Sequence, residues 1–155
     1  MTRHFLLFLL FFSFQYFTMG QGKKVIPAFN PTGTYKLDSK TYTRHGEVYG
    51  YTGSIMVKQI NPDTIAVSLF VCKGAPSYNM GSFVDTLLYR HHQALYHHAG
   101  DDTSCRITFY FTNKGLTVDQ AQANLNFGCG FGHAVFADGY YKKVSGRVPV
   151  IKNEN

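Results

Sequence analysis

The chain has 155 residues, a formal net charge of +6 and no tryptophan. This length allows one domain of ordinary size. Its 15 Lys and Arg residues are scattered, with no run longer than two. A nucleic-acid-binding protein normally carries a basic stripe, so we expect no nucleic-acid partner.

The N-terminus has the pattern of a secretory signal peptide. A basic start over residues 1–4 precedes an apolar run over 5–17, and the small residues Thr18 and Gly20 precede Gln21. This run has about 13 residues, fewer than the roughly 20 of a membrane-spanning helix. We therefore expect cleavage before Gln21, no membrane span, and a secreted or periplasmic protein.

The remainder of the chain consists of short strand patterns separated by turns. We expect a signal peptide over 1–20, an N-terminal arm over 21–31, a β-barrel domain over 32–145 and a C-terminal tail over 146–155. Without its first 20 residues, which hold one arginine and no acidic residue, the chain has 135 residues and a formal charge of +5. That is enough to bury a core.

Strands are predicted from alternation of apolar and polar residues. Within residues 64–73, for example, Ile65, Val67 and Leu69 fall on one face of the strand. No stretch of ten residues has a helical period, although residues 119–125 could form a helical turn or two. The predicted strands cover residues 33–38, 47–60, 64–73, 81–90, 94–98, 105–112, 116–118, 134–136 and 140–145.

Irregularities within this pattern are also predicted. Gly50 and Gly53 are candidate bulge or bend points in the long strand over 47–60. The pair His91 and His92 separates two strand patterns and is predicted to form a hairpin turn.

Eight or nine short antiparallel strands predict a closed or nearly closed up-and-down barrel of about eight strands, with a β-sandwich as the alternative. The first and last strands begin alike, with Gly-Thr-Tyr-Lys at 33–36 and Gly-Tyr-Tyr-Lys at 139–142. If they pair, the sheet closes and leaves no edge to aggregate. Bulky inward residues such as Ile107, Phe109 and Phe111 favour a filled interior.

Three cysteines in an exported chain leave one unpaired. Cys105 opens an alternating strand, and Cys129 lies in a glycine-rich segment over 127–132 that a covalent bond would fix. We expect a Cys105–Cys129 disulfide, and Cys72 as the free thiol. Which cysteine is unpaired is not fixed by the sequence.

Three segments carry a resemblance. Cys-Gly-Phe-Gly-His at 129–133, Asp-Gly-Tyr-Tyr-Lys at 138–142 and Gly-Ala-Pro-Ser-Tyr-Asn at 74–79 resemble small exported bacterial proteins with a lipocalin-like barrel. This resemblance covers most of the mature chain. It implies the fold and the location, but no activity.

The chain also resembles, more weakly, the periplasmic lysozyme inhibitors, which are eight-stranded barrels with a Lys-Gly pair after a tyrosine. Tyr110, Lys114 and Gly115 match this arrangement. Asn113 stands where those inhibitors carry threonine, with Thr112 one residue early. The resemblance implies contact of Lys114 with a partner, whereas a charge of +5 would slow association with a basic lysozyme.

Two loops are candidates for ligand or partner contacts at the barrel rim. One covers residues 76–80 and includes Tyr78, and the other covers 127–133 and includes Phe131 and His133. Loops between strands are where barrels place their ligands. The phenylalanines of the second loop are expected to plug one end of the barrel.

Paired histidines suggest a metal site only weakly. His97 and His98 precede Asp101 and Asp102, and imidazole with carboxylate suits zinc or copper. Adjacent residues of a strand point to opposite faces, so one histidine of the pair is badly placed. We expect no metal and no cofactor.

No catalytic group stands out, because a Cys129 held in a disulfide cannot act as a nucleophile with His133. The sequence therefore favours a monomeric, non-catalytic binding module. It would recognise an unidentified protein partner or a small ligand at the barrel rim. A lysozyme inhibitor and a lipocalin-like carrier of an apolar ligand are the alternatives.

Overall fold

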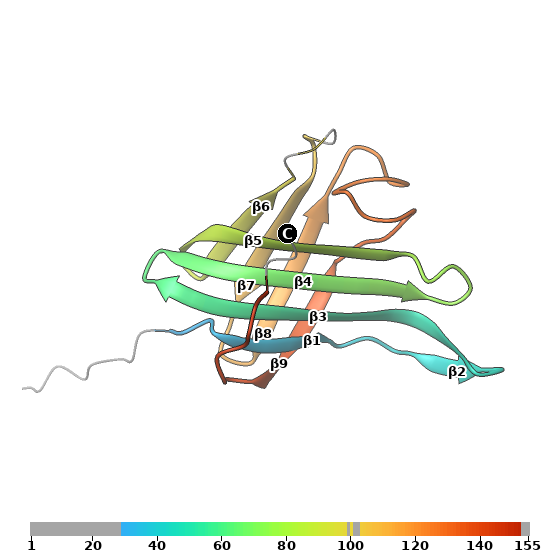
Figure 1. Ribbon diagram of the computed structural model, residues 1–155, viewed down its shortest axis with the longest axis horizontal. Helices are drawn as coiled ribbons and strands as arrows, with labels where there is room; N and C mark the ends of the chain where they lie inside the picture. The colour runs from blue at the N-terminus through green and yellow to red at the C-terminus, as the bar shows by residue number, and fades with distance from the viewer. Residues whose placement is uncertain (1–28, 99, 101–102, 153–155) are drawn as a thin grey trace, which may run out of the picture.

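The computed structural model describes residues 29–98, 100 and 103–152, and their regular structure is antiparallel β-sheet (Figure 1). The predicted signal peptide lies outside these residues. No helix in the described part of the chain is long and apolar enough to cross a membrane. The strands are β1 (Gly33–Leu37), β2 (Tyr42–Arg44), β3 (Glu47–Asn61), β4 (Thr64–Gly74), β5 (Met80–Arg90), β6 (Gln93–His97), β7 (Arg106–Phe111), β8 (Gly115–Ala121) and β9 (Gly139–Ser145).

Eight of these strands close a barrel, as predicted, and β2 is an additional strand beside β3. Their order is β1-β9-β8-β7-β6-β5-β4-β3-β2, and β1 also pairs with β3. The predicted pairing of the first and last strands is confirmed, with Lys36 opposite Lys142 and Leu37 opposite Tyr141. The sheet therefore closes through β1, which has a neighbour on both sides.

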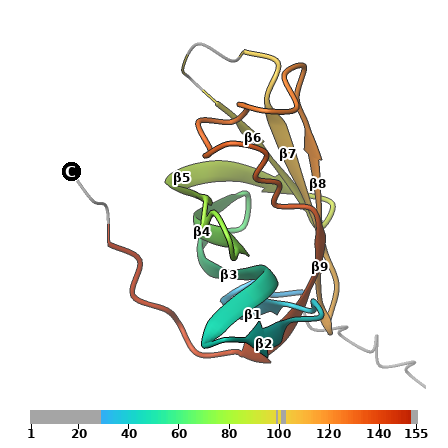
Figure 2. The ribbon, with the colours of Figure 1, turned by 90° about the vertical axis from the view of Figure 1, so that its right-hand side faces the viewer.

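The barrel is flattened into two layers whose strands cross steeply. β3, β4 and β5 form one layer and β6 to β9 the other (Figures 1 and 2). Such orthogonal layers join at two corners. At one corner β1 bridges them, and its pairing with β9 shifts register between Thr34 and Tyr35.

The second corner, between β5 and β6, is paired only beside its turn. Nine residues of β5 have partners on β4, but only Tyr89 and Arg90 have partners on β6. Continued register would place Leu87 opposite Tyr96. Instead the ring of Tyr96 stacks on Phe83, with centroids 3.8 Å apart. The two strands therefore diverge, and side chains rather than hydrogen bonds close this corner.

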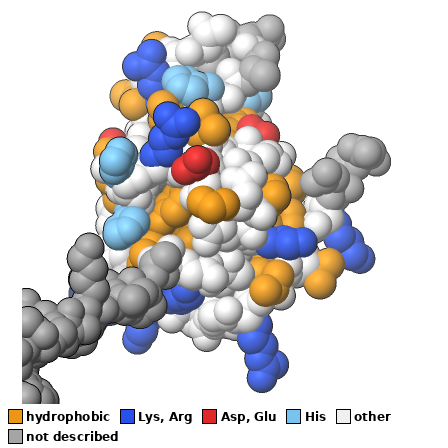
Figure 3. All heavy atoms as spheres, turned by 90° about the vertical axis from the view of Figure 1, so that its left-hand side faces the viewer, with side chains coloured by type: hydrophobic (Ala, Val, Ile, Leu, Met, Phe, Trp, Pro, Cys, Tyr) orange, Lys and Arg blue, Asp and Glu red, His pale blue; other side chains and the backbone are white. Residues whose placement is uncertain are grey.

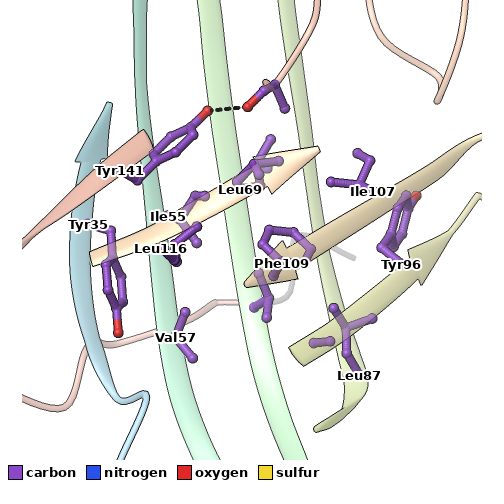
Figure 4. Close-up of a cluster of buried hydrophobic side chains, with 14 of the residues drawn as sticks. Tyr35, Ile55, Val57, Leu69, Leu87, Tyr96, Ile107, Phe109, Leu116 and Tyr141 are labelled. Carbon is purple, nitrogen blue, oxygen red and sulfur yellow. Dashed lines mark hydrogen bonds between the residues drawn. The ribbon is translucent and has the colours of Figure 1, made fainter. Parts of the chain in front are cut away.

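Large side chains fill the barrel interior. Tyr35, Tyr141 and Phe109 are fully buried, together with the aliphatic side chains that alternate along β3, β4 and β7 (Figure 4). The predicted inward residues Ile65, Val67, Leu69, Ile107, Phe109 and Phe111 all belong to this core. Burial of an apolar side chain contributes about 1.5–3 kcal/mol.

The predicted disulfide is present, and Cys72 is free. Cys105 and Cys129 are bonded, with their Cα atoms 5.0 Å apart. This bond ties the glycine-rich segment to the start of β7. Of the two predicted irregularities in the long strand, the one at Gly50 is present, because the β3–β4 register shifts between Tyr49 and Thr52 and Gly50 has a φ of 96°. The one at Gly53 is not, since Gly53 pairs regularly with Val71.

Two predicted elements need correction, and one strand was not predicted. Residues 134–136 are not a strand, because the Ala134 N–H donates to the Asn126 carbonyl within the loop. Their apolar pattern reflects packing of Val135 on the core. Residues 119–121 continue β8 rather than forming a helical turn. The strand β2 was missed because its side chains are exposed and show no alternation.

Candidate functional site

The strongest candidate site is a cleft at the end of the barrel formed by the turns over 61–63, 91–92 and 112–114, which we call the turn end. Its volume is about 800 Å³, within the roughly 300–1,000 Å³ of small-molecule sites. Figure 3 looks onto this end, where hydrophobic side chains and histidines lie among white polar and backbone atoms. The cleft is lined by Phe29, Asn30, Thr32, Gln59, Asn61, Pro62, Tyr89, His92, Gly146 and Val148.

Tyr89 is the most informative residue of this cleft. Its side chain is 5% exposed, and its hydroxyl has no hydrogen-bond partner among the described residues. Burial raises the pKa of Tyr89 to about 12, so the hydroxyl is a neutral donor at physiological pH. A buried hydroxyl without a partner costs about 1–3 kcal/mol, and such a group in a folded protein calls for an explanation.

Two other buried tyrosines show that this fold can satisfy such groups. The Tyr35 hydroxyl donates to the Pro31 carbonyl, and the Tyr141 hydroxyl donates to the Ala137 carbonyl at 3.0 Å (Figure 4). Burial raises the pKa of both hydroxyls. The missing partner is therefore specific to the position of Tyr89.

The turn beside Tyr89 has an unusual sequence for its conformation. His91 and His92 have φ values of 50° and 62°, as in the two-residue hairpin turns that favour Asn-Gly. A residue other than glycine in this region costs about 1–3 kcal/mol and is often found at functional sites. The His92 ring also contacts the Phe29 ring, with centroids 4.6 Å apart, and so helps to form the wall of the cleft.

A positive charge, that of Lys143, lies beside the cleft. Nζ of Lys143 lies 3.3 Å from the carbonyl oxygen of Asn30, which lines the cleft, and 5.5 Å from the centroid of the Tyr35 ring. Partial burial lowers the pKa of Lys143. An electron-rich group in the cleft would therefore meet a neutral donor and a nearby ammonium group.

The groups that line this cleft offer contacts to a ligand. The cleft combines amides, hydroxyls and apolar side chains, and it holds no carboxylate or thiol. Within residues 29–98, 100 and 103–152, no group of three or more His, Cys, Asp or Glu side chains could hold a metal ion. Asp101 and Asp102, considered above as partners of His97 or His98, lie outside the described residues.

The loops predicted as contact regions lie at the opposite end, which we call the loop end and define by residues 75–79 and 122–138. The structure brings the two loops together, because Nδ2 of Asn79 donates to the His133 carbonyl at 3.0 Å and the Gly132 N–H donates to the Met80 carbonyl at 2.9 Å. They are therefore a joined pair of loops.

The individual residues of these loops differ in exposure. Phe131 is buried against Gly81, where an added Cβ would lie 2.3 Å from its ring. It plugs the barrel as expected, whereas Phe127 is exposed. Tyr78 is exposed and accepts a hydrogen bond from the Val48 N–H, and His133 is also exposed.

Lys114 lies away from these loops. It belongs to the turn between β7 and β8, and it lines a separate cleft of about 450 Å³ with Asp38, Asn113, Tyr140, Lys142 and Lys143. The structure does not bring Lys114 together with Tyr78, Phe131 or His133.

The residues of the turn-end cleft could not be recognised from the sequence pattern. Tyr89 was visible only as one inward position of a predicted strand, and nothing local distinguishes it from Tyr35 or Tyr141. The histidine pair at the adjacent turn was the available signal, because a hairpin turn with positive φ rarely carries two histidines.

No protein-family model, curated protein or solved structure matches this chain. The candidate site therefore rests on the geometry of this chain alone.

Proposed function

We propose that this protein is an exported binding protein that holds a small molecule at the turn end of its barrel. The observation that carries the proposal is the buried, unpartnered hydroxyl of Tyr89 in a cleft of about 800 Å³. A ligand acceptor at this hydroxyl would remove the cost of its burial. The Cys105–Cys129 disulfide supports a location outside the reducing cytoplasm.

The lining of the cleft indicates the chemistry of the ligand. Phe29, Pro62 and Val148 offer apolar surface, and Gln59 and Asn61 offer amide groups. Tyr89 offers a donor, and the nearby Lys143 favours an electron-rich oxygen. We infer a molecule with an apolar ring or chain and a carbonyl or carboxylate group. The filled interior means that this ligand binds at the rim and not along the barrel axis.

The first experiment is native mass spectrometry of the protein isolated from the exported fraction of its own host. The expected result is an added mass that disappears on denaturation and is absent after the substitution Tyr89→Phe. The matched control is Tyr141→Phe, which removes a hydroxyl that already has a partner, the Ala137 carbonyl at the loop end, and should keep the added mass. Addition of the same mass to both variants would contradict the proposal.

If the isolated protein carries no added mass, binding at the cleft would be tested with small molecules of known structure. Benzoate, benzamide and cyclohexanecarboxylate each carry an apolar ring and an acceptor, and binding would be followed by amide chemical shifts of the protein. We expect shifts at Gln59, Asn61 and His92 for at least one probe, and their loss in the Tyr89→Phe variant. No shift at the turn end with any probe at millimolar concentration would overturn the proposal.

A further inference from the structure

The open corner of the barrel leaves one edge of β5 without a strand beside it. The Tyr89 N–H donates to the Asp63 carbonyl at 2.8 Å, so the backbone groups of odd-numbered β5 residues point to β4. The backbone N–H and C=O groups of successive residues point to opposite sides of a strand. Those of the even-numbered residues Ser82, Val84, Thr86 and Leu88 therefore point toward β6. Yet β6 pairs with none of these four residues.

Only part of this edge is satisfied elsewhere. The Met80 carbonyl accepts from the Gly132 N–H, and the Thr86 N–H donates to Oδ1 of Asp85 at 2.6 Å. Leu88 adjoins the Tyr89–Ala94 pair, where β6 still lies beside β5. Ser82 and Val84 have no paired residue on β6 among the described residues, and both are exposed. An unpaired edge of this kind is a template for another extended chain.

A groove beside this edge covers the outer face of the β3–β5 layer, and its volume is about 830 Å³. It is lined by residues 82–86, by Met56 of β3, by Ala66, Ser68, Leu69 and Phe70 of β4, and by Val150 and Lys152 of the C-terminal tail. The tail crosses the outside of the β3–β5 layer (Figures 1 and 2). Phe70 is 41% and Val150 77% exposed, so the outer wall of the groove offers apolar surface to a ligand.

The inner side of the edge carries an acidic group. Asp85 belongs to the inward set of β5, but it is exposed because the corner is open. The pKa of Tyr96 on β6 is raised by burial and, to a smaller extent, by the charge of Asp85. Asp85 therefore lies toward the gap between the two strands. Lys152 lies in the same cleft but on the tail.

We propose that the β5 edge binds an extended peptide segment of a partner protein by strand addition. The peptide backbone pairs with Ser82 and Val84. Its outward side chains contact Phe70, Val84 and Val150, and an inward Lys or Arg pairs with Asp85. A second copy of this chain fits less well, because antiparallel pairing centred on this edge would bring two Asp85 carboxylates together.

Selection from a library of random linear octapeptides, displayed on phage and applied to the full mature chain, tests the proposal. We expect enrichment of peptides that alternate apolar and polar residues and carry a central Lys or Arg. With the Asp85→Lys variant, the selected peptides should carry an acidic residue instead. Failure to enrich peptides, or enrichment of sequences without this charge reversal, would overturn the proposal.

The edge itself is tested with Val84→Pro and its control Val84→Thr. Proline removes the N–H that points away from β4, a position where edge strands tolerate it. The best selected peptide should bind Val84→Pro about tenfold more weakly and Val84→Thr with little change. Equal affinity for both variants would contradict strand addition.

Amide hydrogen exchange of the unmodified protein gives a second readout, should Val84→Pro fail to fold. Added peptide should slow exchange at Ser82 and Val84, whereas the same peptide N-methylated at alternate residues should not. Unchanged exchange at these amides would overturn the proposal. The proposal would also be overturned if the wild-type protein sedimented as a dimer and the same amides were protected without peptide. The edge would then be occupied by a second copy of the chain.

Discussion

The two ends of this barrel are built in opposite ways. At the loop end, the long connections are fixed by the Cys105–Cys129 disulfide, by Phe131 packed on Gly81, and by backbone hydrogen bonds between loops. At the turn end, the connections are short, yet His91 and His92 adopt left-handed conformations and Tyr89 lacks a partner. The long loops are thus the stabilised part, and the short turns carry the unfavourable groups.

This difference teaches that loop length is a poor guide to the binding site of this protein. A long loop must be ordered at the cost of backbone entropy, and here its polar groups are used for that purpose. When a short turn keeps unfavourable features, these features indicate a purpose other than stability. Four predictions test this comparison.

Removal of the disulfide should have the largest effect on stability. Cys105→Ser with Cys129→Ser should lower the free energy of unfolding by about 3 kcal/mol, as measured by urea denaturation. Because the bond lies at the loop end, the amide shifts of the turn end should stay unchanged. Altered shifts at Gln59 and His92 would show that the two ends are coupled.

Two tyrosine variants should change stability in opposite directions. Tyr35→Phe removes a buried hydrogen bond to Pro31 and should destabilise the ligand-free protein by about 1–2 kcal/mol. Tyr89→Phe removes a buried unpartnered hydroxyl and should leave stability unchanged or raise it by about 1 kcal/mol. Thermal unfolding with calorimetry measures both. Equal destabilisation would mean that the Tyr89 hydroxyl is bonded in solution, for example to water.

Replacing the strained turn should stabilise the protein. His91→Asn with His92→Gly supplies residues suited to positive φ at both positions, and we expect a gain of about 1 kcal/mol in the free energy of unfolding. The loss of the His92 ring beside Phe29 should weaken binding at the cleft. A turn variant that gains stability and keeps full binding would remove His92 from the site.

The smallest effect is a pH dependence of Tyr89. Its folded pKa of about 12 lies above the unfolded value of about 10, so above pH 10 the unfolded chain releases a proton that the folded chain retains. Stability is therefore complete below about pH 10 and falls as the pH rises toward 12. In ligand-free protein, Tyr89→Phe should show a shallower fall in urea midpoint between pH 10 and 11. Identical slopes would contradict the assignment.

Sequence alone predicted the barrel because its causes are local and periodic. Alternation along residues such as Ile65, Val67 and Leu69 identifies a strand with one buried face, and the similar first and last strands predicted the closure through β1. The disulfide followed from the odd number of cysteines and the glycine-rich segment. The strand predicted over 134–136 failed because apolar spacing alone cannot separate a strand from a loop packed on the core.

The candidate site could not be predicted in the same way. Whether the hydroxyl of Tyr89 finds an acceptor depends on carbonyl positions in distant segments, as the bond between Tyr35 and Pro31 shows. The divergence of β5 and β6 likewise depends on how two layers cross, since the hairpin sequence itself predicts continued pairing. Tyr78, Phe131, His133 and Lys114 remain predicted contacts.

The pairing of β1 with β9 has a consequence for the order of the chain. Thr34 lies opposite Ser145, so the two ends of the barrel sequence are neighbours at the turn end. A short linker from residue 145 to residue 33 would allow circular permutation, with new termini at the His91–His92 turn, where only two residue pairs join the adjoining strands. A permuted chain that starts with β6 would keep all the strand pairings of the sheet apart from the short one between β5 and β6.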